Sequence, residues 1–572
     1  MDPKPFMSRE ITRPVLNGKL GAISTSNSYA TQAGIDILKK GGNAMDAAIA
    51  VALVLAVVEP YHTGIGGGGF SLMYTKKNDR LCGFEARGNA PIGAHRDLFL
   101  DNNGEIDSEA QHFSGKCCVV PGFYRTIQTQ LDRYATMDLM TLSQPAIRLA
   151  REGYRISAMF EDVYNDEHVC HILGKESSMA SLFLKDGKTP YSIGDIQKNP
   201  DLADTIELVA QKGTSYFYAS ELADDIVNAI NNAGGVFCKE DLSNYTATER
   251  GTINTTYRGY NVVGMAPPSS GGLCIAQMLN ILENFDLRSM GRLSADSIHV
   301  IAETMKMTFS DRAVGIGDPD FVHNKVEQFI SKDYARTRAH ALNMNRAQSH
   351  GPGEGIESEI RGRNGNTTHF SIIDKDGNVV SQTISIGDLF GNGILVKGRG
   401  IVLNNFMSYA SPKPANVTTD GMKYGDSNCI EPGKIPMSSN TPTIVFDGNQ
   451  PFLAIGAAGG PQILNAVLQT IINAIDYDMN MEDIVQSPHI SCLTQQQGLI
   501  LEPGISPEAI DGLNKKGHTL VPLKEGECIR FFSNGVIHKN GRLYPAGTQR
   551  QDGCGGAIQE NGMAAYNGTI ME

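Results

Sequence analysis

A threonine at the end of a polar, glycine-rich segment is the residue of this chain with the clearest capacity for chemistry. The stretch Gly365 to Ser371 reads Gly-Asn-Thr-Thr-His-Phe-Ser, so the Thr367 hydroxyl stands where a flexible segment meets a predicted strand. Cleavage of the peptide bond before Thr367 would give it a free α-amino group beside its own hydroxyl, which is the arrangement of an N-terminal nucleophile. Such an amine, with a pKa of about 7.7–8.0, can accept the hydroxyl proton near neutral pH. The motif alone fits a strand-starting β-branched residue equally well.

The residues after Thr367 predict a hairpin that brings a second hydroxyl close to it. The runs 367–373 and 379–386 flank a turn at Asp376 and Gly377. With a three-residue loop Thr367 lies opposite Ser385, and with a two-residue loop it lies opposite Ile386. In either register the Ser385 hydroxyl comes near Thr367 and could orient its hydroxyl or its amine. An outward-facing polar residue is the alternative interpretation of Ser385.

The elements around this junction predict helices that flank packed sheets. Before it, residues 120–310 show mostly amphipathic helical periodicity, and the apolar run 47–58 follows Asn43, a predicted helix N-cap. Residues 345–366 are poor in large apolar side chains, so we expect an exposed segment and a boundary there. After it we expect strands at 367–373, 379–386, 401–404, 442–446 and 452–456, then helices near 460–475 and 481–486. The fold class is therefore α/β of the α+β type.

Composition and charge exclude several classes of protein. The chain has 572 residues, 41% of them hydrophobic and 19% charged, which is enough apolar side chain for a large folded core. The net charge of −13 and the lack of a basic block argue against nucleic-acid binding. The longest apolar run, 47–58, is far shorter than the roughly 20 residues of a membrane span, and residues 1–15 lack the apolar centre of a secretory signal. We therefore expect a cytoplasmic protein without a membrane partner.

Two other motifs resemble ligand-binding sites but lack the residues or spacing that such sites need. The run Gly64 to Gly69 lacks the Lys-Ser or Lys-Thr pair that completes a phosphate-binding loop. The group His168, Cys170 and His171 does not have the spacing of a standard zinc site. We accordingly expect neither a metal nor a cofactor.

Several long segments, in order along nearly the whole chain, resemble the γ-glutamyltranspeptidase (glutathione hydrolase) family. The longest of these segments are VEPYHTGIGGGGF at 58–70, YRGYNVVGMAPPSSGG at 257–272, NTTHFSIIDKDGNVVSQT at 366–383 and PMSSNTPTIV at 436–445. The resemblance implies the four-layer αββα sandwich of N-terminal nucleophile hydrolases. It also implies a precursor that cuts itself between Asn366 and Thr367. The products would be a large chain, 1–366, and a small chain, 367–572, which stay together as a heterodimer.

The resemblance also assigns roles to matching residues. Thr367 would attack an amide carbonyl, and the resulting acyl-enzyme would be resolved by water or by an acceptor amine. Gly459 and Gly460 would form the oxyanion hole, because glycine lets backbone N–H groups approach an oxyanion closely. Three further residues would hold the substrate carboxylate: the guanidinium of Arg87, which suits bidentate binding, and the hydroxyls of Ser438 and Ser439.

The chain departs from the family where the substrate's α-amino group is bound. The family has an Asn, a Glu or Gln, and an Asp at the positions of Gly387, Phe406 and Tyr409. A buried ammonium without an anionic partner is costly, so we expect a small amide whose acyl part carries a carboxylate but no adjacent ammonium, such as a glutaryl group. Phe406 and Tyr409 would then form an apolar or stacking wall.

Two alternatives stay open at this stage. Asp388 or Asp426 could replace the missing acid and preserve γ-glutamyl specificity, as in a true γ-glutamyltransferase or glutathione hydrolase. The chain could also be an uncleaved, non-catalytic relative that serves as a binding protein, although the intact set of Thr367, Ser385, Gly459 and Gly460 favours an enzyme.

Overall fold

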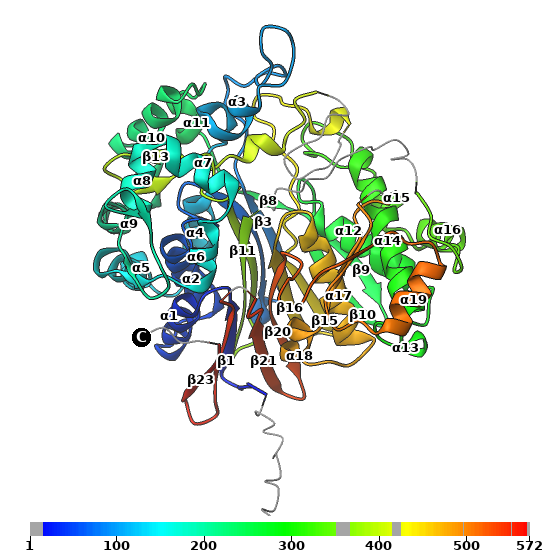
Figure 1. The fold of residues 1–572 in the computed structure, drawn as a ribbon. Coiled ribbons are helices and arrows are strands. Elements are labelled where there is room, and N and C mark those ends of the chain that lie inside the picture. Colours follow the sequence, from blue (N-terminus) through cyan, green and yellow to red (C-terminus); the bar gives the residue numbers. More distant parts are fainter. Residues whose placement is uncertain (1–14, 351–365, 414–424, 496, 551, 569–572) are drawn as a thin grey trace, which may run out of the picture.

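Two β-sheets pack face to face between two layers of helices in the computed structural model (Figure 1). The structure describes residues 15–350, 366–413, 425–495, 497–550 and 552–568. The four-layer αββα sandwich predicted from the sequence is confirmed. Among the described residues, none of the helices combines the length and apolarity that crossing a bilayer requires.

The first sheet has eight strands and holds Thr367 in its centre. Its order is β23-β22-β1-β11-β12-β2-β3-β8, and each described neighbour pair is antiparallel. Strand β11, which begins at Asn366, therefore has partners on both sides. The strands are β1 (Gly21–Thr25), β2 (Gly68–Thr75), β3 (Arg80–Ala86), β8 (Thr248–Arg250), β11 (Asn366–Asp374), β12 (Val379–Gly387), β22 (Cys554–Ile558) and β23 (Ala564–Asn567).

The second sheet has six strands in the order β21-β20-β16-β15-β10-β9. Its strands β16 and β20 lie against β11 of the first sheet, so the two sheets meet behind the candidate nucleophile. The strands are β9 (Thr252–Tyr257), β10 (Tyr260–Met265), β15 (Thr443–Asp447), β16 (Gln450–Ala458), β20 (Phe532–Lys539) and β21 (Arg542–Gly547).

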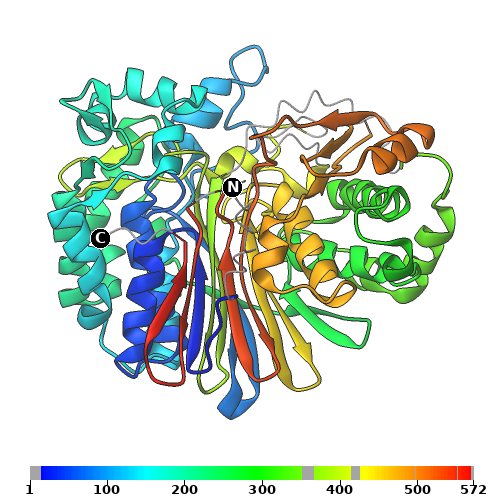
Figure 2. The ribbon, with the colours of Figure 1, turned by 60° about the horizontal axis from the view of Figure 1, so that its bottom comes forward.

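Helices cover the outer face of each sheet, as Figure 2 shows with α1 and α2 in blue on one side and α12, α14 and α17 on the other. On the first side lie α1 (Ser28–Lys39), α2 (Ala44–Val58), α4 (Phe123–Arg133), α5 (Leu139–Glu152), α9 (Pro200–Lys212) and α10 (Glu221–Asn232). On the second side lie α12 (Gly271–Leu282), α14 (Ala295–Gly315), α16 (Lys332–Ala341), α17 (Gln462–Ile475), α18 (Met481–Gln486) and α19 (Pro507–Lys515).

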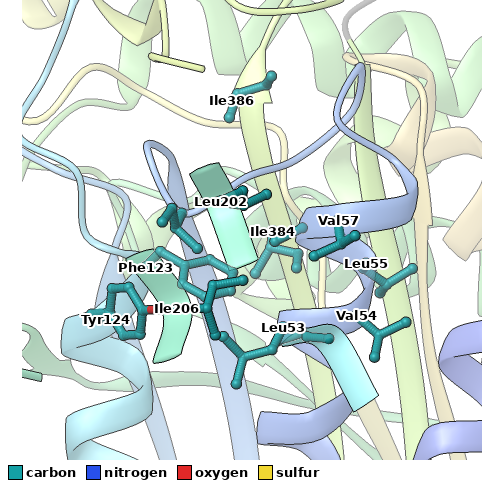
Figure 3. Packing of buried hydrophobic residues seen from close by; sticks show 14 of the residues in the cluster. Leu53, Val54, Leu55, Val57, Phe123, Tyr124, Leu202, Ile206, Ile384 and Ile386 are labelled. Atoms are coloured by element: carbon teal, nitrogen blue, oxygen red, sulfur yellow. The ribbon is translucent and has the colours of Figure 1, made fainter. Parts of the chain in front are cut away.

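Helix α2 is buried along its whole length and anchors the first helical layer. Asn43 caps it, as the sequence predicted, and Asp46 completes a reciprocal capping box. Figure 3 shows Leu53 of this helix on the side that faces Phe123 of α4 and Leu202 of α9, with Ile384 of β12 nearby. Burial of these side chains fixes the helical layer on the strand that carries Ser385.

The stretch 120–310 is mostly helical, as expected, but it also contains β8, β9 and β10 between residues 248 and 265, and these contribute to both sheets. Two residues of the glycine run, Gly68 and Gly69, belong to β2. Most of the segment expected to be exposed, 351–365, lies outside the described residues.

Close packing of backbones explains the glycine run. A Cβ atom on any residue of Gly66–Gly69 would lie 2.0–2.2 Å from a main-chain oxygen, and these oxygens belong to Val402, Ser385, Ala86 and Thr383. Gly67 matters most for the site, because the main-chain oxygen that its Cβ would meet belongs to Ser385. The run therefore lets β2 and the loop before it pack against the strand end that carries Ser385.

Replacing Gly67 with alanine should disturb this packing, whereas the same change at Gly64 should not. The Cβ of Gly67→Ala meets Ser385 O at 2.0 Å, but that of Gly64→Ala finds its nearest neighbour, Ile386 Cγ2, at 3.7 Å. We expect Gly67→Ala to lower the free energy of unfolding by at least about 2 kcal/mol, measured by denaturant unfolding. Equal stability of the two variants would contradict this account.

Candidate active site

Thr367 lies at a β-bulge near the start of β11, opposite the end of β12. Along most of this hairpin the pairing follows the register predicted for a three-residue loop, with Thr368 opposite Ile384. The register shifts between Asn366 and Thr368, since Asn366 pairs with Gly387. A bulge of this kind re-aims a side chain away from the regular pleat. Thr367 is 5% exposed, so little of the nucleophile is open to solvent in the uncut chain.

The Ser385 hydroxyl connects the groups that would take part in cleavage. It donates a hydrogen bond to the carbonyl oxygen of Asn366 at 2.7 Å and accepts one from the backbone N–H of Gly387 at 3.0 Å. The Thr367 hydroxyl lies 3.4 Å from the Ser385 hydroxyl oxygen and donates toward it. The two hydroxyls named from the sequence are thus brought together at the Asn366–Thr367 peptide bond.

Gly459 and Gly460 occupy the turn between the end of β16 and the first residue of α17. Their φ angles are 126° and 59°, which favour glycine, and a Cβ on Gly459 would lie 2.4 Å from Arg530 O. Gly459 lines the same cavity as Thr367, and the N-terminus of the helix that follows favours negative charge. The turn can therefore present backbone donors to a developing oxyanion.

The cavity beside Thr367 also contains charged residues that the sequence analysis missed. It is lined by Asn366, Thr367, Ala458 and Gly459, by the apolar residues Met159, Val163, Leu389 and Phe532, and by His62, Asp162, Asp166, Cys528, Arg530 and Arg550. His62 lies inside a recognised segment and could have been found there. Asp162 and Asp166 are close in the sequence, as are Cys528 and Arg530, but no spacing signal joins one pair to the other.

The four central strands of the first sheet bring Arg87 to the edge that holds Thr367. Ser385 pairs with Gly68 across β12 and β2, and Gly69 pairs with Ala86 across β2 and β3, so Arg87 directly follows the strand end on this edge. Arg87 is buried, and its guanidinium lies 4.4 Å from the centre of the Phe406 ring and 5.2 Å from that of Tyr409. Cations are stabilised over aromatic faces at such distances.

A buried carboxylate holds Tyr409 in this position. Asp388 accepts hydrogen bonds from the Tyr409 hydroxyl at 3.2 Å and from the Asn405 amide at 2.9 Å, and His112 Nδ1 lies 3.7 Å from its second oxygen. Burial alone would raise the pKa of the Asp388 carboxyl, but the nearby imidazoles of His112 and His168 and the hydrogen bond from Asn405 lower it to about 2. Asp388 is therefore ionised and engaged with the residues around it.

The surroundings of Gly387 and Asp426 bear on the expected departure from the family's amine-binding groups. Gly387 has a φ of 102°, and a Cβ there would lie 1.9 Å from Asn405 Oδ1, so no side chain fits. Asp426 is exposed and pairs with Arg96 at 2.6 Å. Asp388 and Asp426, the two acids that could replace the family's acidic group, therefore both interact with other residues.

Ser438 and Ser439 lie in a separate buried turn, outside the lining of the cavity around Thr367. The Ser438 hydroxyl accepts from Asn440 N at 3.1 Å, and the Ser439 hydroxyl accepts from Arg312 at 2.7 Å. Arg312, which is 1% exposed, had no sequence signal. The segment before this turn is joined to the segment after Arg87 by two backbone hydrogen bonds between Ala90 and residues 433–434.

Comparison with known proteins decides the family. A family profile described as Gamma-glutamyltranspeptidase matches residues 30–557. The chain is 38% identical over 560 residues to the glutathione hydrolase proenzyme of Escherichia coli K12, with 96% of this chain and 94% of that protein covered. The chain belongs to the γ-glutamyltranspeptidase family. It is therefore an N-terminal nucleophile hydrolase of this family, with relatives that are made as proenzymes.

Proteins named as acylases are also similar to this chain. The Acylase ACY 1 proenzyme of Pseudomonas sp. SE83 is 33% identical over 548 residues, covering 95% of this chain and 94% of that one. The crystal structure of cephalosporin acylase from Bacillus halodurans superposes with a TM-score of 0.83 at 28% identity, covering 97% and 98% of the two chains. The family thus contains both glutathione hydrolases and acylases similar to this chain.

The depressed pKa of Asp388 predicts a pH-dependent loss of stability. A carboxyl with a pKa of about 2 in the folded chain, against an ordinary value of 3.8, contributes about 2 kcal/mol above pH 4. This contribution is lost as the pH falls through 2. Asp388→Asn should therefore have a lower free energy of unfolding than wild type at pH 7, measured by urea unfolding. The difference between the two proteins should become smaller as the pH falls towards 2. Asp426→Asn, at an exposed pair, serves as the control and should change little.

Proposed function

We propose that this chain is a precursor that cuts itself between Asn366 and Thr367 and then acts as a threonine amidohydrolase or acyltransferase. The observation that carries the proposal is the position of the Ser385 hydroxyl. It donates a hydrogen bond to the Asn366 carbonyl oxygen at 2.7 Å, and the Thr367 hydroxyl lies 3.4 Å from the Ser385 hydroxyl oxygen. Attack of Thr367 Oγ1 on the Asn366 carbonyl carbon puts negative charge on the oxygen that Ser385 already contacts. The C–N bond between Asn366 and Thr367 then breaks, its nitrogen takes up the proton lost by the hydroxyl, and the acyl group is left as an ester on Thr367 Oγ1. Water hydrolyses this ester, which leaves chain 1–366 with a C-terminal carboxylate and chain 367–572 with a free α-amine on Thr367.

In the mature enzyme, Thr367 supplies both the nucleophile and the base. Its α-amine accepts the hydroxyl proton as Oγ1 attacks the substrate amide, and it returns the proton to the departing amine. Backbone N–H groups of the turn at Gly459 and Gly460 stabilise the oxyanion. Water or an acceptor amine resolves the acyl-enzyme, and this chemistry is proposed to need no metal or cofactor.

The acyl group is proposed to carry a carboxylate without an adjacent ammonium. Arg87 supplies the cation for the carboxylate, with Ser438 and Ser439 as further hydroxyl contacts. Phe406 and Tyr409 stack on Arg87 where the family has acidic or amide groups, and Gly387 has no room for a side chain. A glutaryl-like dicarboxylic monoamide fits these groups, and the acylases among the relatives support the same direction. The alternative substrate class is a true γ-glutamyl amide.

Self-cleavage predicts a dependence on the Thr367 hydroxyl. Wild type and Thr367→Ser should give two bands of roughly 40 and 22 kDa on a denaturing gel, at about 110 Da per residue. Thr367→Ala should stay one chain because it has no nucleophilic oxygen. Two bands from the alanine variant, or one uncut band from the wild type, would contradict the proposal, and the latter result would favour the binding-protein alternative.

The missing amine site predicts substrate preference. With anilides that differ only in the α-amino group, kcat/KM should be at least about 10-fold higher for the glutaryl than for the γ-glutamyl compound, because Asp388 and Asp426, the two acids considered as partners for the ammonium, are engaged with other residues. A butyryl anilide, which lacks the carboxylate, is the control and should react poorly. Preference for the γ-glutamyl compound would refute the proposed substrate class while leaving self-cleavage intact.

A further inference from the structure

A second group of ionisable side chains lies on the far side of the second sheet, away from Thr367. His299 and Glu303 are four residues apart on α14 and therefore share one face of the helix, and His518 follows α19, which packs against α14 (Figure 1). One potential ligand atom from each lies within 4.8 Å of the others. All three residues are buried, at 0%, 0% and 6% exposure respectively.

A backbone carbonyl fixes the tautomer of His299. Its Nε2 lies 2.9 Å from the oxygen of Asn343, which can only accept, so Nε2 carries the proton. The lone pair of Nδ1 then points toward His518 Nε2, 2.7 Å away. Metal-binding histidines are held in this way, with one ring nitrogen donating to a carbonyl and the other free to ligate.

The histidines are poised to be neutral and Glu303 to be charged. Burial lowers the pKa of His299 and lowers that of His518 to about 4, so both keep a lone pair at neutral pH. Burial alone would raise the pKa of Glu303, but contacts with His350 and Lys306 lower it below its ordinary range. Two neutral imidazoles and one carboxylate form a donor set that suits zinc.

Two side chains outside this group contact Glu303, namely His350 and Lys306. His350 Nε2 lies 2.6 Å from Glu303 Oε2, and its side chain is 7% exposed. Lys306 opposes a cation here, since its ammonium lies 2.7 Å from Glu303 Oε1. That ammonium also donates to Gln348 O at 2.7 Å and to Gln495 Oε1 at 2.5 Å, so it keeps two acceptors when Glu303 binds a metal.

We propose that His299, Glu303 and His518 form a zinc site whose fourth position is open to water. Bonds of about 2.0–2.1 Å in a tetrahedron place ligand atoms roughly 3.3 Å apart, so the two imidazoles need to separate by about half an ångström, and ligand atoms that now lie up to 4.8 Å apart need to approach. His518 then carries its proton on Nδ1 and binds through Nε2. His299 and Glu303 precede Thr367 and His518 follows it, so the ion would link the two chains that self-cleavage produces. The site itself does not depend on that cleavage.

Zinc binding by the whole purified protein tests the site directly. After dialysis against EDTA, titration with zinc chloride in the presence of a chromophoric competitor should give one tightly bound ion per molecule. Cobalt(II) in place of zinc should give the intense visible bands of a tetrahedral site with nitrogen ligands. Failure of the wild type to bind one equivalent of zinc, or a weak octahedral cobalt spectrum, would overturn the proposal.

A pair of histidine variants separates this site from surface binding. His518→Gln should weaken zinc binding at least about 10-fold, since loss of supporting contacts alone typically costs 10–100-fold. His340→Gln, at an exposed histidine on α16, should bind zinc like the wild type. Unchanged affinity in His518→Gln would overturn the proposal. If that variant does not fold, the stoichiometry and cobalt spectrum of the wild type still decide.

Discussion

The hydrogen bond from the Ser385 hydroxyl to the carbonyl oxygen of Asn366 is the contact on which the rest of the site depends. It requires β11 and β12 to pair in one register and to end together in the middle of an eight-stranded sheet. The bulge at Thr367 lies where its hydroxyl comes within 3.4 Å of the Ser385 hydroxyl. A slip of β12 by one residue would send the Ser385 side chain to the opposite face of the sheet.

Much of the molecule serves to hold that register. The glycines of 66–69 let main chains approach to distances that no side chain tolerates, and the buried helix α2 packs on the outer face of the same strands. On the inner face, β16 and β20 close the site from behind, and β16 delivers the turn at Gly459. The nucleophile and the candidate oxyanion donors therefore come from different sheets, and the packing of the two sheets sets the distance between them.

The region around Arg87 shows how substrate specificity can change while the arrangement of the two sheets is kept. Phe406 and Tyr409 face the guanidinium, and Asp388 is engaged with Tyr409 and Asn405, so a buried anion is present but already bonded. A sequence reading that only counts acids would treat Asp388 as a possible amine site. Its hydrogen bonds and low pKa show a carboxylate whose partners are already in place.

Local pattern in the sequence was enough for the Thr367 hairpin, the capped helix α2 and the order of helices and strands after residue 367, because periodicity, caps and turns act over a few residues. Long motifs carried the family and hence the four layers. Only the tertiary structure decided what lies beside these elements: the charged lining of the cavity, the partner of Ser439 at Arg312, and the cluster of His299, Glu303 and His518. Those neighbours are up to hundreds of residues apart in the chain, and no local rule relates them, since their contacts follow from how the sheets and helical layers pack.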